Sequence, residues 1–159
     1  MPNMMQMVLG LGSNLGPRLQ YLTHAVSRVA ELPRTRVMRQ SAVYETPPLG
    51  PPQPDYLNAA VRIETKLAPL ELLSHLKMIE RHCGRQRTEH WGARTLDIDI
   101  LWAAAYRISH RDLELPHPGL QERAFALGPL LDVVPELQIY FGPKLQALGG
   151  RPPIVRYRW

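Results

Sequence analysis

Residues 91–101 read Trp91-Gly92-Ala93-Arg94-Thr95-Leu96-Asp97-Ile98-Asp99-Ile100-Leu101, and beyond Arg94 their apolar and polar side chains alternate. Such alternation is typical of a β-strand that rests one face on a core. Asp97 and Asp99 would then project together from the other face. Two neighbouring carboxylates repel each other unless a cation lies between them, so the spacing indicates a site for a hard cation such as Mg²⁺. A solvated strand face would show the same alternation, and the pair alone leaves this alternative open. The expected core residues of the strand are Leu96, Ile98 and Ile100.

The composition predicts one globular domain that spans residues 1–159. The chain is 45% hydrophobic, which is enough to bury a core without disulfides or a structural metal. No apolar run approaches the ~20 residues that cross a bilayer, and the start, Met1-Pro2-Asn3-Met4, lacks the features of a signal peptide. We therefore expect a cytoplasmic protein with no membrane partner. The net charge of +5 favours anionic partners, and the single cysteine, Cys83, is expected to be a buried thiol.

Two amphipathic helices are expected before this strand. The first should end before Pro33, and the second should start near Pro69 and end at Gly84, because proline suits a first helical turn and glycine suits the end of a helix. The second has the clearer apolar stripe and is the most strongly indicated helix of the chain. The two stripes consist of Leu19, Leu22, Val26 and Val29, and of Leu72, Leu73, Leu76, Ile79 and Cys83.

The remaining strands fix the predicted fold class. Strands are expected at residues 8–12, 36–44 and 56–64, with a stiff proline-rich loop at residues 46–55 between the last two. The order strand, helix, strand, strand, helix, strand is that of the split β-α-β or ferredoxin-like fold. This is an α+β fold in which helices cover an antiparallel sheet.

The C-terminal part carries weaker patterns. Residues 115–119 form a proline-rich connector, and residues 121–131 are expected to be a short helix. One helical turn is expected at residues 145–148, and a late strand at residues 154–157. The patterns predict no functional role for the tail after residue 140.

The glycine-rich stretch Gly10-Leu11-Gly12-Ser13-Asn14-Leu15-Gly16 is not a dinucleotide fingerprint, because the third glycine comes one residue too late. A phosphate-binding P-loop is also absent from the sequence. The glycines by themselves predict a tight turn from strand to helix. A nucleotide, if one binds, would therefore be held by side chains and a metal.

Several cations and one histidine surround the acidic strand in the sequence. Arg85, Arg87 and Arg94 precede it and Arg123 follows it. Each guanidinium group can bind two phosphate oxygens at once, and it stays charged at any working pH. Any one of them could equally be a solvated surface residue, but their clustering beside two carboxylates favours a polyphosphate with its metal. His117 lies between Pro116 and Pro118, which fix its direction, although a loop histidine would fit the same pattern.

An aromatic slot is a further candidate site. Tyr56 and Phe125 could stack on a flat heterocycle while the amide of Asn58 reads its edge. Without context, the same residues could be core aromatics and a turn-side amide.

Several motifs, in this order, strongly resemble one family. They are Gly12-Ser13-Asn14, Tyr44-Glu45-Thr46-Pro47-Pro48-Leu49-Gly50, Pro54-Asp55-Tyr56-Leu57-Asn58-Ala59-Ala60-Val61, Gly84-Arg85-x-Arg87, Trp91-Gly92-x-Arg94-Thr95-Leu96-Asp97-Ile98-Asp99-Ile100-Leu101 and Leu115-Pro116-His117-Pro118. The family is 6-hydroxymethyl-7,8-dihydropterin pyrophosphokinase, an enzyme of folate biosynthesis, and the resemblance runs from about residue 8 to residue 135.

The resemblance implies that the pyrophosphoryl group of MgATP moves to the hydroxymethyl oxygen of the pterin and leaves AMP. It also implies that Asp97 and Asp99 hold two Mg²⁺ ions and act in catalysis together with Arg85 and Arg94. The residues expected to contact ATP are Glu80, Arg85, Trp91, Arg94, Ile100, His117 and Arg123. The residues expected to contact the pterin are Thr46, Pro47, Leu49, Tyr56, Asn58 and Phe125.

From this resemblance we expect a stand-alone, monomeric enzyme whose partners are ATP and the pterin, with no nucleic acid. Two other classes of protein share some of these features. A small RNA-binding module would suit the basic charge and the strand order, but the central strands lack the exposed aromatics that it needs. A nucleotidyltransferase would also use paired aspartates and two metals, and the aromatic slot with its amide argues against it.

Overall fold

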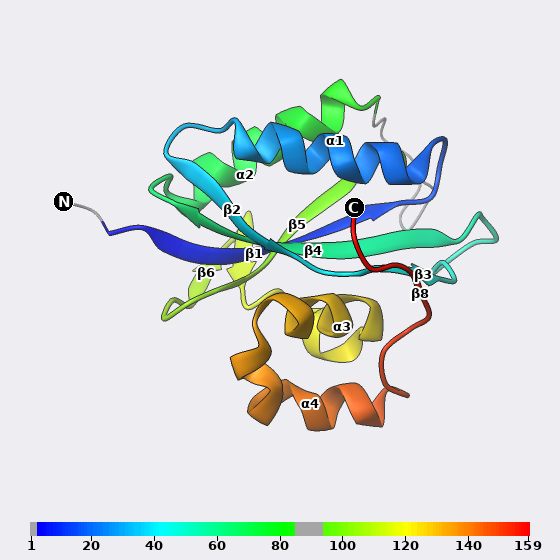
Figure 1. Ribbon diagram of the computed structural model, residues 1–159. Helices are drawn as coiled ribbons and strands as arrows, with labels where there is room; N and C mark the ends of the chain where they lie inside the picture. Colours follow the sequence, from blue (N-terminus) through cyan, green and yellow to red (C-terminus); the bar gives the residue numbers. More distant parts are fainter. Residues whose placement is uncertain (1–2, 85–93) are drawn as a thin grey trace.

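β1 (Met5–Ser13) is central to an antiparallel sheet in the computed structural model, which describes residues 3–84 and 94–159 (Figure 1). It pairs with β4 (Tyr56–Thr65) on one side and with β5 (Asp97–Ala103) on the other. The far edge of β4 pairs with both β2 (Thr35–Gln40) and β3 (Val43–Thr46). β8 (Ile154–Arg156) adds to β3 at the edge of the sheet. This order of strands confirms the predicted ferredoxin-like α+β fold.

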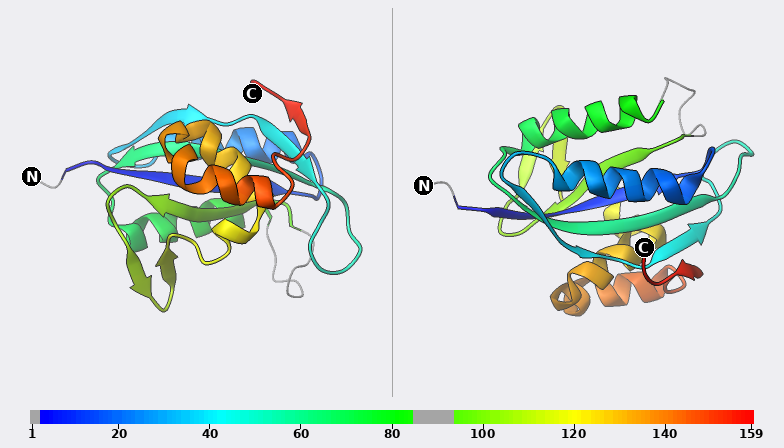
Figure 2. Two further views of the ribbon diagram at one scale, coloured as in Figure 1. Left: turned by 90° about the horizontal axis from the view of Figure 1, so that it is seen from below. Right: turned by 45° about the horizontal axis from the view of Figure 1, so that its top comes forward.

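Helices cover both faces of the sheet. α1 (Arg18–Ala30) and α2 (Pro69–His82) lie on one face, and α3 (Ala124–Val133) and α4 (Gln138–Ala147) lie on the other (Figures 1 and 2). α1 ends before Pro33 as predicted, and α2 begins at Pro69 and is followed by Gly84, whose φ of +77° suits glycine. Short 3-10 turns lie at Leu120–Glu122 and Pro135–Leu137, and β6 (Ile108–His110) forms a separate hairpin with β7 (Leu113–Leu115).

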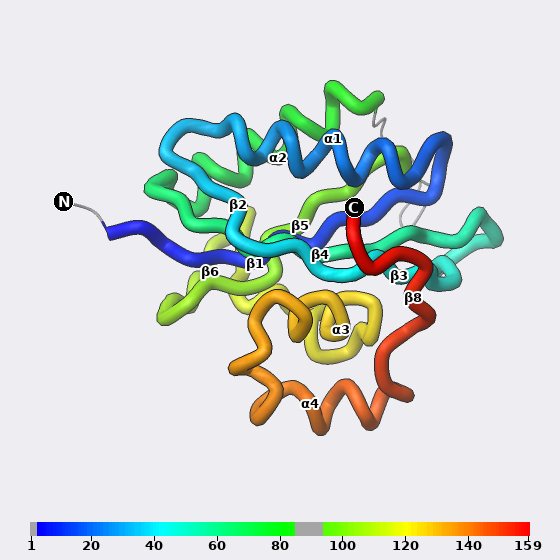
Figure 3. Tube along the Cα trace, viewed as in Figure 1, coloured from blue at the N-terminus to red at the C-terminus, as the bar shows by residue number. Residues whose placement is uncertain are grey.

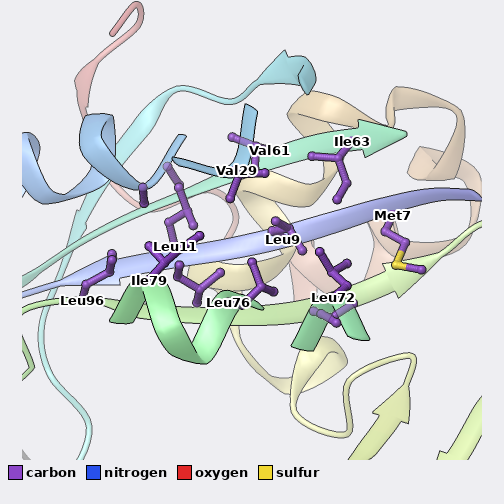
Figure 4. Close-up of a cluster of buried hydrophobic side chains, with 14 of the residues drawn as sticks. Met7, Leu9, Leu11, Val29, Val61, Ile63, Leu72, Leu76, Ile79 and Leu96 are labelled. Atoms are coloured by element: carbon purple, nitrogen blue, oxygen red, sulfur yellow. The ribbon is translucent and has the colours of Figure 1, made fainter. Parts of the chain in front are cut away.

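The core has two parts because the side chains of each strand alternate between the two faces. The larger part lies between the sheet and the α1–α2 layer, and Figure 4 shows Leu9 and Leu11 of β1 there beside Leu76 of α2. The core residues predicted for this strand all belong to this part: Ile98 and Ile100 of β5, and Leu96 just before it. Leu101 packs in the second part, under α3. The face of β5 that carries the two aspartates therefore points toward the α3 side of the sheet.

Three sequence predictions need correction. The single strand expected at residues 36–44 is two strands, because the chain breaks at Ser41, whose hydroxyl accepts a hydrogen bond from the N–H of Ala60 at 2.8 Å. The helix expected at residues 121–131 is a 3-10 turn followed by α3. The expected turn at residues 145–148 is the end of the ten-residue α4, which contains Pro143 and is held to α3 by buried Leu145. Tertiary packing there outweighs the low helix propensity of proline.

The expectation for the cysteine agrees with the structure, and the helices can be compared with what a membrane span requires. Cys83 is free and buried, and desolvation raises the pKa of its thiol, so it is a core residue as expected. Over the described ranges, none of the helices has the length and apolar character that crossing a membrane requires.

Candidate active site

A pocket of about 300 Å³ opens on the α3 side of the sheet. Its floor consists of β1, β4 and β5, one wall is the start of the proline-rich loop after β3, and the opposite wall is the segment that leads into α3. Most of the predicted site residues lie around it, although they come from distant parts of the sequence. Those that line the pocket are Thr46, Pro47, Leu49, Tyr56, Asn58, Arg94, Asp97, Asp99, His117, Arg123 and Phe125.

The two aspartates of β5 line this pocket together, as the alternation predicts. Arg94 reaches the same space, and its Nη1 lies 3.2 Å from Oδ1 of Asp97. The side chains of this pair are about one-quarter exposed, at 26% and 23%. A cation from the protein thus already faces one of the carboxylates, which reduces the repulsion between the two acids.

The carboxylate pair fits Mg²⁺ better than a metal that needs a complete protein cage. Across residues 3–84 and 94–159, no group of three or more histidine, cysteine or acidic side chains is placed to hold an ion. Mg²⁺ is commonly held by one or two carboxylates, with substrate phosphates and water supplying its other ligands. Asp97 and Asp99 could therefore hold Mg²⁺ together with a polyphosphate in the same pocket.

The other half of the pocket is lined by an amide and two aromatic rings. Asn58 is buried, and its Nδ2 donates to the hydroxyl of Thr46 at 2.6 Å. Tyr56 begins β4 directly opposite Thr46, whereas Phe125 comes from the first turn of α3. The carbon of the Arg123 guanidinium lies 5.9 Å from the centre of the Phe125 ring. A flat heterocycle could stack on these rings while polar atoms read its edge.

Gly10 and Gly12 form part of the pocket floor, which the sequence did not reveal. Both lie within β1, which agrees with the strand expected at residues 8–12, and the glycine of the turn that follows is Gly16, with φ of +71°. A Cβ on Gly12 would lie 3.2 Å from Oδ1 of Asn58 and 3.4 Å from Cδ1 of Tyr56. These glycines keep the floor open next to the amide, since any side chain would enter the pocket. A Gly-x-Gly pattern inside a predicted strand could have indicated this, because glycine in a strand often marks a place where a ligand approaches the backbone closely.

His117 is held in a defined orientation at the edge of the pocket. Its backbone N–H donates to the carbonyl of Leu101 at 2.8 Å, and its Nδ1 accepts from the N–H of Gly119 at 3.0 Å. Burial and then the positive charge of Arg123 lower the pKa of His117 below its ordinary value, against the weaker opposite effect of Asp97 and Glu114. At neutral pH the imidazole is thus uncharged, and its Nε2 is left as the atom that can donate toward a ligand.

Asn14 joins two walls of the site and was missed as a site residue. Its Nδ2 donates to Oε1 of Gln53 and to the carbonyl of Pro54, both at 2.8 Å, at the end of the proline-rich loop. Its Oδ1 accepts from the backbone N–H of Arg94 at 2.7 Å. It is only 2% exposed. The side-chain amide of Asn14 thus joins the proline-rich loop to the backbone of Arg94. The sequence around Asn14 predicts only a turn and does not indicate these contacts.

Two predicted residues within the described ranges do not line the pocket, and two more lie outside those ranges. Ile100 points into the core on the opposite face of β5. Glu80 lies on α2, behind the sheet, and its carboxylate accepts from the N–H of Ile98 at 2.8 Å. Arg85 and Trp91 lie outside the described residues.

Replacing Glu80 should destabilise the fold. The carboxylate is 5% exposed and accepts a backbone N–H of β5, a strand at the edge of the sheet. Glu80→Ala would leave that N–H buried without its acceptor, and we expect the free energy of unfolding to fall by about 1–3 kcal/mol. Urea denaturation measures this. Glu80→Gln keeps an acceptor oxygen and should lose less; equal losses in the two variants would contradict the assigned hydrogen bond.

Comparison with known proteins agrees with this geometry. The family model for 7,8-dihydro-6-hydroxymethylpterin-pyrophosphokinase (HPPK) matches residues 8–135. The chain is 46% identical over 132 residues to 2-amino-4-hydroxy-6-hydroxymethyldihydropteridine pyrophosphokinase of Methylorubrum extorquens, covering 82% of this chain and 84% of that one. It is 42% identical over 129 residues to the enzyme of the same name from Synechocystis, covering 81% of this chain and 66% of that one.

A solved structure also shares the fold. An HPPK-DHPS crystal structure in complex with substrates matches with a TM-score of 0.70 and 14% sequence identity. The match covers 91% of this chain and 44% of the solved chain, so this protein spans less than half of that longer one. At this identity the likeness establishes the fold, while the family follows from the sequence matches. This chain belongs to the 7,8-dihydro-6-hydroxymethylpterin-pyrophosphokinase family.

Proposed function

We propose that the pocket under α3 is where this protein carries out the reaction of its family. The protein is an ATP-dependent diphosphokinase of folate biosynthesis: it transfers the pyrophosphoryl group of ATP to the hydroxymethyl group of 6-hydroxymethyl-7,8-dihydropterin. The single observation that supports the site is that one pocket is lined both by a pair of carboxylates and by an amide with two aromatic rings. The two halves suit the two substrates of that reaction.

The pterin occupies the half lined by Tyr56, Asn58 and Phe125. Small-molecule pockets are typically apolar with a few placed polar groups, and two aromatic rings with one amide give this half that character. The rings of Tyr56 and Phe125 stack on the pterin. The amide of Asn58, held by Thr46, offers hydrogen bonds to the pterin edge.

The triphosphate lies along the half lined by Arg94, His117 and Arg123. The two guanidinium groups offset the negative charge that spreads over the phosphate oxygens, and Nε2 of neutral His117 donates a hydrogen bond to one of them. The described pocket places these groups beside the carboxylates. Arg85 and Trp91, also proposed for ATP, fall outside the described residues. The side chain of Ile100 points from β5 into the core, and Glu80 accepts a hydrogen bond from β5 on that same side of the sheet, so neither side chain lines the pocket.

Asp97 and Asp99 are the proposed metal ligands. Bound Mg²⁺ would neutralise phosphate charge and lower the pKa of the attacking hydroxyl. In the transfer, the hydroxymethyl oxygen forms a bond to the β-phosphorus, the bond from that phosphorus to the bridging oxygen breaks, and AMP leaves with that oxygen. The hydroxyl proton is released to water. The residues of the pocket supply the alignment of the two substrates and the countercharge.

Several finer points are part of this proposal. Two carboxylates beside a triphosphate offer enough oxygen ligands for two Mg²⁺ ions, which is the number that we propose. We also propose a monomer, as the resemblance of the sequence implies. A cytoplasmic location and the absence of a nucleic-acid partner stay predictions from the sequence.

The reaction is tested by incubating the protein with MgATP and 6-hydroxymethyl-7,8-dihydropterin. We expect AMP and the pterin diphosphate in equal amounts, and no AMP when the pterin is left out. ADP as the product, or no turnover that depends on the pterin, would contradict the proposal. Release of free pyrophosphate, together with no heat of pterin binding in calorimetry, would favour a nucleotidyltransferase instead.

A further inference from the structure

The C-terminal residues 151–159, here called the strap, return to the sheet beside the proposed pterin site. After α4 the chain turns at Gly149 and Gly150, which have φ of +99° and +81°. It then runs along the outer edge of β3 (Figures 1 and 3). The strap lies beyond residues 8–135, the part matched by the family model, and nothing in the mechanism above uses it.

The strap holds the outer edge of β3 by backbone pairing. Arg156 lies opposite Val43, Ile154 lies opposite Tyr44, and the N–H of Glu45 donates to the carbonyl of Pro153 at 3.0 Å. The inner edge of the same short strand pairs with β4, where Tyr44 is opposite Asn58 and Thr46 is opposite Tyr56. A single four-residue strand therefore separates the strap from the residues proposed to bind the pterin.

A hydrogen-bonded cluster joins the strap to α3 as well. Asp132 of α3 accepts from the hydroxyl of Tyr44 at 2.6 Å and from Nε of Arg151 at 3.2 Å. Tyr44 is fully buried, and its burial raises the pKa of its hydroxyl, which keeps it a neutral donor. Gly128 of α3 also lies beside the strap, because a Cβ built there would be in ordinary van der Waals contact with Arg151 and Pro152, at 3.5 Å from each. Asp132 belongs to the same helix as Phe125.

The end of the strap is fixed at the break between β2 and β3. Nε1 of Trp159 donates to the carbonyl of Ser41 at 2.6 Å, and Nε2 of Gln40 donates to the carbonyl of Trp159 at 3.1 Å. β3 is thus held at its first residues by Trp159, along its edge by β8, and through Tyr44 by the cluster on Asp132.

The same strand is connected to both ends of the proline-rich loop. Thr46 ends β3 and starts the loop. Glu45 pairs with Arg18 at 2.8 Å, and Nη1 of that arginine also donates to the carbonyl of Asp55 at 2.9 Å, at the end of the loop. A shift of β3 would therefore move Thr46, Pro47 and Leu49, which line the pocket.

We propose that the strap is a positioning element for the pterin: it holds β3 and α3 so that the loop and Phe125 face Tyr56 and Asn58 at the right separation. This inference rests on the proposed function of the pocket. Tyr44, Asp132, Arg151 and Trp159 are its positioning residues. β8 of the strap pairs with β3, whereas the carboxylate strand β5 lies at the opposite edge of the sheet, beyond β4 and β1, so we expect the main effect in the pterin half.

The test compares strap variants with controls on the same strap. Arg151→Ala and Trp159→Ala should each raise the KM for the pterin by about tenfold, because small displacements of positioned groups weaken productive binding strongly. The KM for MgATP should stay within about twofold of its original value, because the carboxylate strand β5 lies at the opposite edge of the sheet from the strap. Arg158→Ala and Tyr157→Ala are the matched controls, since both side chains are exposed and neither forms a hydrogen bond or an ion pair with β3 or α3. They should leave both KM values unchanged.

A second measurement separates this inference from the function on which it rests. Hydrogen exchange of the backbone amides at residues 46–55 should become faster in Arg151→Ala and Trp159→Ala and stay unchanged in the two controls. Unchanged exchange, or an equal rise in both KM values, would overturn the role of the strap. If the original protein shows no pterin-dependent turnover, the proposed function fails, and the exchange comparison still decides whether the strap positions the loop.

Discussion

Asp97→Ala should lower kcat by at least about a thousandfold, because it removes one of the two carboxylates proposed to hold Mg²⁺ against the triphosphate. The fold should survive. The side chain is partly exposed and forms an ion pair with Arg94, which is also partly exposed and can be solvated instead. Loss of one acid also relieves its repulsion with Asp99. We therefore expect the free energy of unfolding to change by no more than about 1 kcal/mol.

AMP production at saturating substrates measures this effect, with urea denaturation run on the same samples. Asp112→Ala is the control, because Asp112 carries the same side chain on the exposed β6–β7 turn and does not line the pocket. It should retain full turnover. Turnover of Asp97→Ala at the original rate would show that this carboxylate does not serve the metal.

Phe125→Ala should raise the KM for the pterin by about 10- to 100-fold, which corresponds to the ~1.5–3 kcal/mol that burying an aromatic side chain against a ligand contributes. Phe125 lines the pocket from α3, opposite the strand that carries Tyr56 and Asn58. Its loss removes one stacking surface for the heterocycle. The KM for MgATP should change much less, because the carboxylates and Arg94 are unaffected.

Steady-state kinetics with each substrate varied in turn provides the measurement. Phe141→Ala is a matched control: Phe141 lies on α4, packs against the core under α3 and does not line the pocket. It should lower stability and leave both KM values as they are. A rise in the KM for MgATP without a rise for the pterin would place the adenine, and not the pterin, against Phe125.

The local patterns of the chain determined its elements. Alternation at Asp97 and Asp99 predicted a strand with two acids on one face, and the structure has β5 with both acids in one pocket. Proline at the start and glycine after the end marked α2. These features depend on neighbours one to four residues apart, which is the range over which backbone geometry repeats. The ferredoxin-like order of strands then follows from the order of the elements.

Motifs also identified most of the site, because the resemblance brought together residues that no local pattern connects. It placed Thr46, Tyr56 and Phe125 in one site, and all three line the pocket. It also included Ile100 and Glu80, which the structure places behind the sheet. A motif records that a residue belongs to the site, but it does not say on which side of the strand its side chain lies.

By itself, then, the sequence determined the strands, the main helices and the chemical types of the site residues. Only the tertiary structure decided that Gly12 keeps the pocket floor open beside Asn58, that Asn14 joins the proline-rich loop to Arg94, and that the strap reaches β3 from the far end of the chain. Each of these three features depends on contacts between residues that are far apart in the chain. For Asn14 the partners lie 39 positions away at Gln53 and 80 positions away at Arg94. Such distances are set by how the layers pack, and periodicity along the chain carries no information about them.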